Sequence, residues 1–372
     1  MAKSDAPSAV TNANAETRLA SAKSAPRRVL VARLSALGDV AMTIPVLYSI
    51  CKAYPDTQFL MLTQTLPAKL FINHPDNLSV KGIKTADYKG LCGMYRLWKE
   101  IQRDFNPEVF VDLHAVLRTF ALGLFARLSG VRVEHIDKGR SGKKALTRAH
   151  DKRLLPLISS RARYREVFRR FGMHLQSYTF QSIFPEGKAD REEFSDIYSE
   201  DKGAERWIAI APFAKHKGKI YPLEQMTKVV EQLAGRKDTR LFLFGAGAEE
   251  CAVLQRWADT HPQNIHNVAI KRYGFAKELA LLSHCDVMLS MDSANMHLAS
   301  LVGLRAVTIW GATHPYCGFL GWRQSEEDTV QLNLTCRPCS VFGNKPCLND
   351  DYYCLSGITP EMVTSAVDKA LS

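Results

Sequence analysis

Short apolar runs with strand character alternate with helical segments twice along the 372 residues, and this alternation limits the possible folds most strongly. The strand-type runs of the first series lie at 29–32, 58–62 and 109–113. Apolar residues at helical spacing occupy 40–54 and 116–128. Strands separated by helices form a parallel sheet, because the chain needs a crossover to return to the same edge. The first series therefore predicts a Rossmann-like domain at 27–190.

The alternation restarts after a polar stretch at 186–202. Strand-type runs follow at 207–211, 241–244, 287–290 and 307–310. They predict a second Rossmann-like domain at 200–358, and Thr359 and Pro360 suit the N-cap and first position of a closing helix at 359–372. The predicted fold class is thus α/β, with two Rossmann-like domains that face each other across a cleft. Ligands are expected at the carboxyl ends of the strands.

The first 26 residues have an unusual composition, and the two halves of the chain differ in charge. Residues 1–26 are rich in Ala, Ser, Asn and Thr without a signal-type apolar core, so we expect a disordered tail and a cytoplasmic protein. The net charge of +11 lies in residues 1–200, which hold 31 Lys and Arg against 20 Asp and Glu, whereas 201–372 hold 18 of each. Such a surface attracts a nucleic acid, an anionic membrane face or a phosphorylated lipid. The alternative is a solvated helix face.

Two acidic residues stand where a strand passes into a helix. Asp39 follows Gly38 after the first strand, at the expected mouth of the cleft, where a carboxylate can accept a proton from an attacking hydroxyl. Asp292 ends a later strand, and the helix behind it offers free backbone N–H groups to a phosphate. The first turn of that helix holds Ser293, Ala294, Asn295 and His297. Taken alone, these positions favour the plainer interpretation, in which Asp39, Asp292 or Ser293 caps a helix and His297 is a core histidine.

Two further turns carry groups suited to a nucleotide diphosphate. Lys217 and Lys219 follow the strand at 207–211, and their ammonium groups suit a diphosphate whose charge grows as it leaves. Glu249 follows a Gly-Ala-Gly turn at the end of another strand, where a carboxylate can bind ribose hydroxyls. A solvated basic loop and a plain strand–helix turn are the alternatives.

Taken together, the four motifs resemble glycosyltransferase family 9, the heptosyltransferases of lipopolysaccharide core assembly. The similar segments are RLSALGDVAMTIP from Arg33, KIYP from Lys219, DSANMHLA from Asp292 and IWGATHP from Ile309. The resemblance runs from about Val29 to the last helix. It implies a GT-B fold and an inverting transfer of heptose from ADP-heptose that needs no metal or other cofactor. The implied acceptor is a lipopolysaccharide inner core, either Kdo-lipid A or a heptosylated core.

The resemblance also implies roles for single residues. Asp39 would be the general base, and Lys219 would stabilise the diphosphate leaving group. The donor-binding residues that it implies are Lys217, Glu249, Tyr273, Asp292, Ser293, Ala294, Asn295 and His297. Arg118 and Arg132 are the candidates for acceptor binding. The implied acceptor is an anionic lipopolysaccharide precursor, so we expect a cytoplasmic protein that works at the inner membrane face and expect no nucleic acid partner.

Two positions depart from the family pattern. Ala294 stands where the family usually has glycine, and Ala214 replaces a hydroxyl that some members place near the phosphates. Both departures concern the identity of the donor, so a GT-B transferase that uses another nucleotide sugar remains an alternative. A non-enzymatic nucleic-acid-binding protein is the third hypothesis. It predicts an affinity that falls steeply with salt, but it leaves the phosphate-type turns of the neutral second half unexplained.

The nine cysteines fall into two groups. The scattered ones are expected to be small core residues, and they are Cys51, Cys92, Cys251, Cys285 and Cys317. The clustered ones are Cys336, Cys339, Cys347 and Cys354. A Cys-x-x-Cys pair supplies half of a tetrahedral zinc site, whereas disulfides are disfavoured in a reducing cytoplasm. We therefore expect a structural site that holds the last loop, either with zinc or without a metal.

Overall fold

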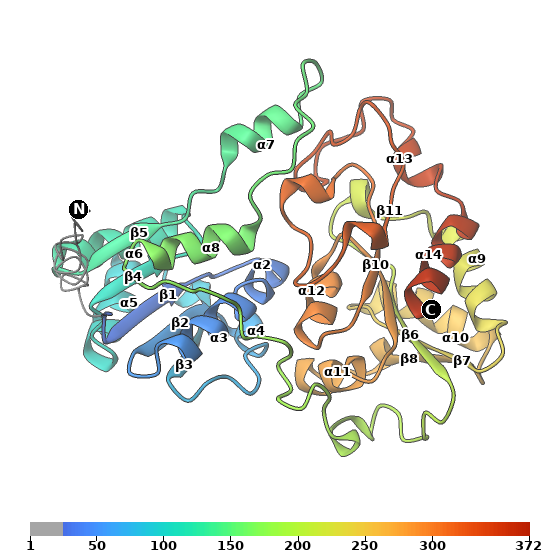
Figure 1. Cartoon of the computed structure of the whole chain (residues 1–372), viewed down its shortest axis with the longest axis horizontal. Helices are drawn as coiled ribbons and strands as arrows, with labels where there is room; N and C mark the ends of the chain where they lie inside the picture. The colour runs from blue at the N-terminus through green and yellow to red at the C-terminus, as the bar shows by residue number, and fades with distance from the viewer. Residues whose placement is uncertain (1–24) are drawn as a thin grey trace, which may run out of the picture.

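Two parallel sheets, each with helices on both faces, make up the computed structural model (Figure 1). The structure describes residues 25–372, so the predicted disordered tail lies outside the described residues apart from its last two positions. This arrangement confirms the predicted α/β class with two Rossmann-like folds. No helix within residues 25–372 combines the length and the apolar character that a membrane crossing requires.

The first sheet has the strand order β3-β2-β1-β4-β5, and its pairings are parallel. Its strands are β1 (Arg28–Ala32), β2 (Gln58–Gln64), β3 (Leu78–Ile83), β4 (Val109–Asp112) and β5 (Arg132–His135). The helices of this part are α2 (Leu37–Ala41), α3 (Ile44–Ala53), α4 (Thr65–Ala68), α5 (Gly90–Asp104), α6 (Leu117–Leu128), α7 (Arg140–Leu146) and α8 (Ser160–Arg169). Val29 and Val31 pack into the apolar cluster that holds α3 and α8, whereas Leu30 and Ala32 pack into the cluster of α5 and α6. Burial on both faces explains why β1 reads as a continuous apolar run.

The second sheet has the order β11-β10-β9-β6-β7-β8 and is also parallel. Its strands are β6 (Arg206–Ala211), β7 (Thr239–Leu243), β8 (Ile265–Asn267), β9 (Val287–Met291), β10 (Ala306–Ile309) and β11 (Thr329–Val330). The helices are α9 (Leu223–Ala234), α10 (Ala248–Thr260), α11 (Phe275–Leu282), α12 (Ala294–Leu301), α13 (Tyr353–Ser356) and α14 (Pro360–Leu371). Thr359 caps α14 by accepting the N–H of Met362 at 3.4 Å, and α14 packs on α9.

The carboxyl edges of the two sheets meet at the domain boundary, where α2 packs against α12. The connecting segment between the sheets packs on both sides of this boundary. The ring of Phe180 lies 5.8 Å from that of Tyr48 in the first domain and 6.2 Å from that of Trp322 in the second. A single apolar cluster therefore contains residues of both domains.

The segment around α7 stands out from the first domain and reaches the second (Figure 1). Its backbone is tied there by the N–H groups of Leu157 and Ser160, which donate to the carbonyls of Tyr316 and Gly318 at 2.9 Å. The Lys152 ammonium donates to three carbonyls of the cysteine-bearing loop. This segment consequently connects the first domain to the loop that carries Cys336.

Two details differ from the sequence-based expectations. The helix expected over 40–54 is broken, because α2 ends at Ala41 and α3 starts at Ile44, with Pro45 in the first turn of α3. Proline suits that position, since it lacks the N–H that the first turn leaves unpaired. Cys92 is exposed in α5, so the expectation that it is a core residue is wrong.

We expect Trp98→Ala to lower the free energy of unfolding by about 3–5 kcal/mol, because it removes a buried side chain and leaves a cavity. Trp98 is fully enclosed in the cluster of α5 and α6, and its indole N–H donates to the Ser129 hydroxyl at 2.9 Å. Urea unfolding measures the loss. Lys99→Ala on the exposed side of the same helix is the control, and an equal loss in both variants would contradict the assignment.

Candidate active site

Asp39 occupies the first turn of α2, directly after β1. Its Oδ2 lies 2.5 Å from the Arg33 guanidinium and accepts the N–H of Ala36 at 3.3 Å. The same guanidinium donates to the Leu113 carbonyl at 2.8 Å, which fixes it between β1 and β4. A carboxylate held in this way is oriented, with one side left to solvent.

Residues that the sequence analysis did not assign surround Asp39. The Tyr164 hydroxyl of α8 donates to the Asp39 carbonyl at 3.3 Å. Burial lowers the pKa of His114 to about 4, helped by the positive charges of Arg33 and Lys138, so this imidazole is neutral at pH 7. Burial also lowers the pKa of Lys138. The sequence held one indication of this group, because Arg33 begins the segment RLSALGDVAMTIP that contains Asp39.

Across the boundary, Asp292 and Lys219 form a buried ion pair. Asp292 ends β9 with 3% of its surface exposed, and its Oδ2 lies 2.7 Å from the Lys219 ammonium. The contact is electrostatic, since this oxygen has no well-directed hydrogen bond. Each group neutralises the other, which offsets part of the cost of taking two charges out of water. Lys219 itself comes from the short 3₁₀ turn Lys217–Lys219 after β6.

His297 connects the two halves of the site. It lies in α12 with 7% of its surface exposed, and its Nδ1 has no hydrogen-bond partner. A Cβ atom added to Gly38 would lie 2.7 Å from the His297 ring, so only glycine allows α2 to approach this closely. Burial lowers the pKa of His297 to about 4, although Asp292 and Asp39 act in the opposite direction. The imidazole is therefore neutral and close to both carboxylates.

The start of α12 is arranged as expected for the amino end of a helix. Ser293 is the N-cap, and its hydroxyl accepts the N–H of Asn295 at 3.3 Å. Ala294 and Asn295 begin the helix beside Gly38, with the Ala294 Cα 3.3 Å from where a Gly38 Cβ would lie. The backbone N–H groups of this turn face the same boundary as Asp39. An anion can be held here by those groups and by the helix dipole.

The outer donor candidates lie around the carboxyl edge of the second sheet without touching the ion pair. Glu249 is exposed in the first turn of α10, whereas its neighbour Glu250 accepts the N–H of Ala246 at 2.7 Å. Lys217 faces the Tyr352 ring at 4.9 Å. Tyr273 is half-buried, with the Lys271 ammonium 5.3 Å from its ring centre.

The two acceptor candidates are placed differently. Arg118, in the first turn of α6, lines a surface hollow together with Lys138 and Arg140. Arg132 starts β5, about 10 Å of strand before its carboxyl end. It packs on the Phe171 ring and donates to the Arg170 carbonyl. The structure therefore does not bring Arg132 to the site, because β5 runs in the same direction as β1 and Arg132 is at its amino end.

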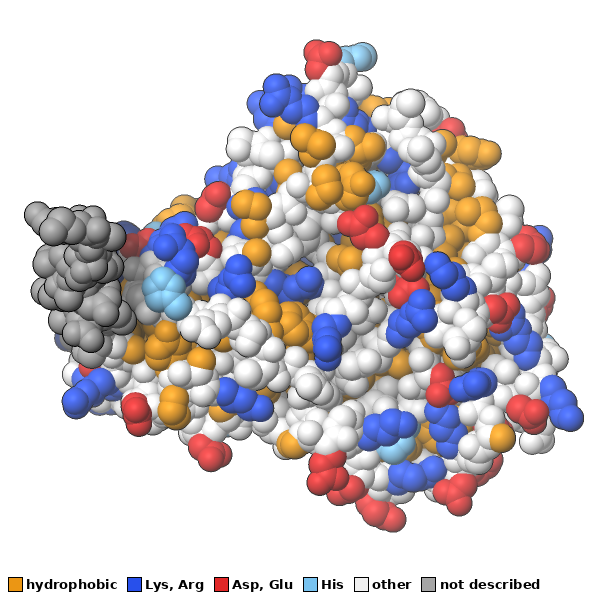
Figure 2. All heavy atoms as spheres, viewed as in Figure 1, with side chains coloured by type: hydrophobic (Ala, Val, Ile, Leu, Met, Phe, Trp, Pro, Cys, Tyr) orange, Lys and Arg blue, Asp and Glu red, His pale blue; other side chains and the backbone are white. Residues whose placement is uncertain are grey.

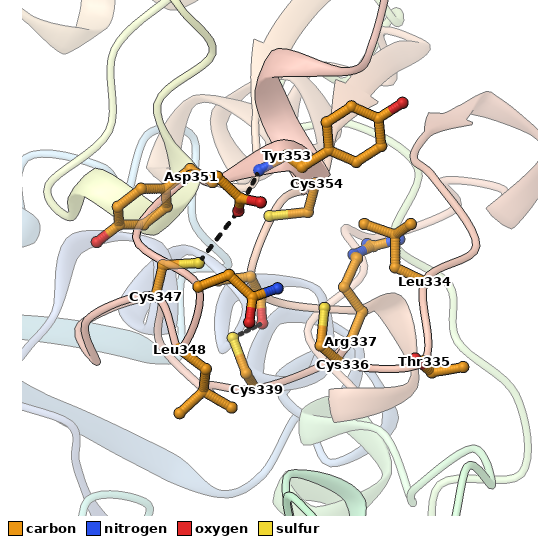
Figure 3. Close-up of a pocket in the computed structure, with 13 residues that line it drawn as sticks. Leu334, Thr335, Cys336, Arg337, Cys339, Cys347, Leu348, Asp351, Tyr353 and Cys354 are labelled. Atoms are coloured by element: carbon orange, nitrogen blue, oxygen red, sulfur yellow. Dashed lines mark hydrogen bonds between the residues drawn. The ribbon is translucent and has the colours of Figure 1, made fainter.

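The four clustered cysteines line one cavity of about 200 Å³ (Figure 3). Burial raises the pKa of Cys354 to about 11, and the nearby thiols of Cys339, Cys336 and Cys347 act in the same direction. All four thiols are free. Between residues 25 and 372, no group of three or more His, Cys, Asp and Glu side chains has the arrangement of a metal site.

We expect His297→Asn to reduce the acid sensitivity of the fold. The pKa of His297 is lower in the folded protein than in the unfolded chain, so the unfolded chain binds more protons between pH 6.5 and pH 4. Stability is therefore present above pH 6.5 and is lost as the pH falls, by on the order of 3 kcal/mol for this residue. Urea unfolding across this range measures the slope, with the exposed His74→Asn as control. An unchanged slope would contradict the buried neutral state.

Known proteins resemble this chain in sequence and in fold. Residues 124–347 match glycosyltransferase family 9 (heptosyltransferase). A lipooligosaccharide heptosyltransferase 2 of Campylobacter jejuni is 22% identical over 337 residues, which cover 90% of this chain and 96% of that protein. A lipopolysaccharide heptosyltransferase 1 of Pseudomonas aeruginosa is 23% identical over 329 residues, covering 84% and 86%.

Solved structures show the same fold. A family 9 glycosyltransferase from Veillonella parvula superposes with a TM-score of 0.70 at 17% identity, covering 93% of this chain and 97% of that one. An E. coli heptosyltransferase with ADP superposes with a TM-score of 0.62 at 16% identity, covering 92% and 99%. These likenesses confirm the GT-B fold. With the match over residues 124–347, the chain belongs to glycosyltransferase family 9 and is an enzyme of the heptosyltransferase type.

Proposed function

We propose that this protein transfers a heptose from ADP-heptose to a lipopolysaccharide inner-core acceptor, either Kdo-lipid A or a heptosylated core. The observation that carries the proposal is the contact of the His297 ring of α12 with Gly38 of α2, beside Asp39, and the charges of both Asp39 and Asp292 act on the pKa of His297. A proton acceptor and a phosphate-type helix start thus meet at one boundary. The names of the relatives from C. jejuni and P. aeruginosa support the same substrate class.

In the proposed reaction, Asp39 accepts the proton of an acceptor hydroxyl while that oxygen attacks the anomeric carbon of the heptose. The bond from that carbon to the diphosphate breaks, and ADP leaves from the opposite face, which inverts the configuration. Arg33 is a positioning residue, because its guanidinium holds the Asp39 carboxylate.

Donor binding would rearrange the ion pair of the second domain. The diphosphate offers new negative charge to Lys219, which leaves the Asp292 carboxylate available to accept hydrogen bonds from the sugar hydroxyls. The backbone N–H groups of Ser293, Ala294 and Asn295 would hold phosphate oxygens beside His297. Lys217, Glu249 and Tyr273 are proposed to bind the diphosphate, the ribose and the adenine, respectively.

A transferase that uses another nucleotide sugar is the second candidate, favoured by the methyl group of Ala294 at the phosphate turn. A screen of nucleotide sugars with product mass as readout separates the two candidates. Tight binding of ADP rather than UDP or GDP supports the first. We propose that the anionic partner of the basic first half is the lipid-linked acceptor at the cytoplasmic face of the inner membrane, and that no nucleic acid binds.

We expect Asp39→Asn to lower kcat by roughly a hundredfold to ten-thousandfold, because the amide cannot accept the proton. Binding of ADP, measured by calorimetry, is expected to survive, since the donor groups lie in the second domain. Asp56→Asn, an exposed carboxylate of the first domain, is the matched control. Normal turnover in Asp39→Asn would exclude the mechanism.

We further propose that the four clustered cysteines form a structural site. Zinc is the ion to test first, because cysteine thiolates are common ligands of structural zinc. In this proposal, replacing Cys336 and Cys354 together by serine lowers the melting temperature by several degrees. Cys92→Ser, which changes an exposed thiol elsewhere, leaves it unchanged. Metal analysis of the purified protein distinguishes the two forms of the site: about one zinc per chain, or none. An unchanged melting temperature in the double variant would contradict a structural role.

A further inference from the structure

One face of α6 is apolar and faces solvent. It is formed by Leu117, Phe120, Leu124 and Leu128, which we call the α6 stripe. These residues are spaced by three, four and four positions, so they lie along one side of the helix over about 16 Å. Leu117 is 88% exposed and Leu128 is 76% exposed. Isolated exposed leucines are common, whereas a continuous stripe indicates an interaction surface.

Other side chains widen this surface on both sides. On one side, the Tyr95 ring of α5 packs 5.3 Å from that of Phe125, and Leu91 is exposed one turn before Tyr95. On the other side, Phe120 packs 4.6 Å from the His135 ring at the end of β5. The exposed apolar area therefore spans α5 and α6 and continues to the edge of the first sheet.

Positive charges flank the stripe. Arg118 and Arg127 lie on opposite sides of it, because they are displaced by about a quarter turn from its centre. Lys138 and Arg140 line the hollow at its amino end together with Leu117 and Phe120. No acidic residue occurs between Asp112 and Glu134. Basic and apolar side chains lie next to each other over the first domain in the space-filling view (Figure 2).

We propose that the α6 stripe and its flanking basic residues dock this protein on an anionic phospholipid bilayer. Apolar side chains bordered by Arg and Lys are suited to the boundary between acyl chains and headgroups, where the apolar groups enter the bilayer and the cations meet phosphates. A second copy of the chain fits this face poorly. In a symmetric dimer, Arg118 and Arg127 would face the same arginines without a carboxylate to compensate them.

The α6 stripe lies close to the proposed acceptor site, and its role in presenting an acceptor rests on the proposed function. Leu117 follows the carboxyl end of β4, and the hollow at its side includes Lys138, whose pKa is raised slightly by the charge of Asp39 although burial lowers it overall. A protein docked through α6 would hold the mouth of the site at the bilayer surface. A lipid-linked acceptor could then reach Asp39 while its acyl chains stay in the membrane.

The test is co-sedimentation of the full chain with vesicles of phosphatidylethanolamine and phosphatidylglycerol, compared with vesicles of phosphatidylcholine alone. We expect binding to the anionic vesicles that weakens as salt is raised. The double variant Leu124→Ser/Leu128→Ser is expected to bind at least about tenfold more weakly, since two apolar side chains no longer enter the bilayer. Ile270→Ser/Met362→Ser, which changes two exposed apolar residues of the second domain, is the matched control.

The proposal is overturned if the wild type ignores anionic vesicles, or if the α6 double variant binds them as the wild type does. A wild-type dimer that the α6 variant dissociates, with unchanged vesicle binding, would assign the stripe to a second copy instead. Transfer to a water-soluble, deacylated acceptor separates this proposal from the proposed function. Equal transfer by wild type and variant supports a pure docking role, whereas vesicle binding without any transfer would reject the proposed reaction alone.

Discussion

The close approach of α2 and α12 is the constraint on which the site depends. It brings the first turn after β1 against the first turn after β9, and it is possible because Gly38 has no Cβ where the His297 ring lies. The buried ring is neutral, so it fills this contact without adding a charge of its own. Asp39 and Asp292 belong to different sheets, and this packing places them at one boundary.

Each carboxylate of the site is held by a cation of its own domain. Arg33 binds Asp39, and Lys219 binds Asp292. The two ion pairs differ in whether a bound substrate can break them. Arg33 is fixed to the Leu113 carbonyl and keeps its partner oriented. Lys219 lies on a short 3₁₀ turn and makes an ion pair that an incoming diphosphate can compete for.

The strands and the residues at their carboxyl ends could be predicted from the sequence, because they depend on local patterns. Strands buried on both faces read as apolar runs, and the residues that follow them had to meet at the carboxyl edges of parallel sheets. Arg33, His114 and Lys138 come together only through long-range packing, which no local pattern reports. Arg132 was misplaced for a related reason. Only Val133 of β5 is buried, so this strand has no apolar run that would reveal it in the sequence. The sequence therefore did not show that Arg132 lies at the amino end of a strand, away from the site.

The aromatic contacts of Phe180 have a consequence for motion. Its ring packs on Tyr48 and on Trp322, and its backbone N–H donates to the Ser49 hydroxyl at 3.2 Å. A wide hinge opening would expose these rings to water. Sliding of the two lobes by small amounts keeps them covered, so these contacts favour shear over wide hinge opening.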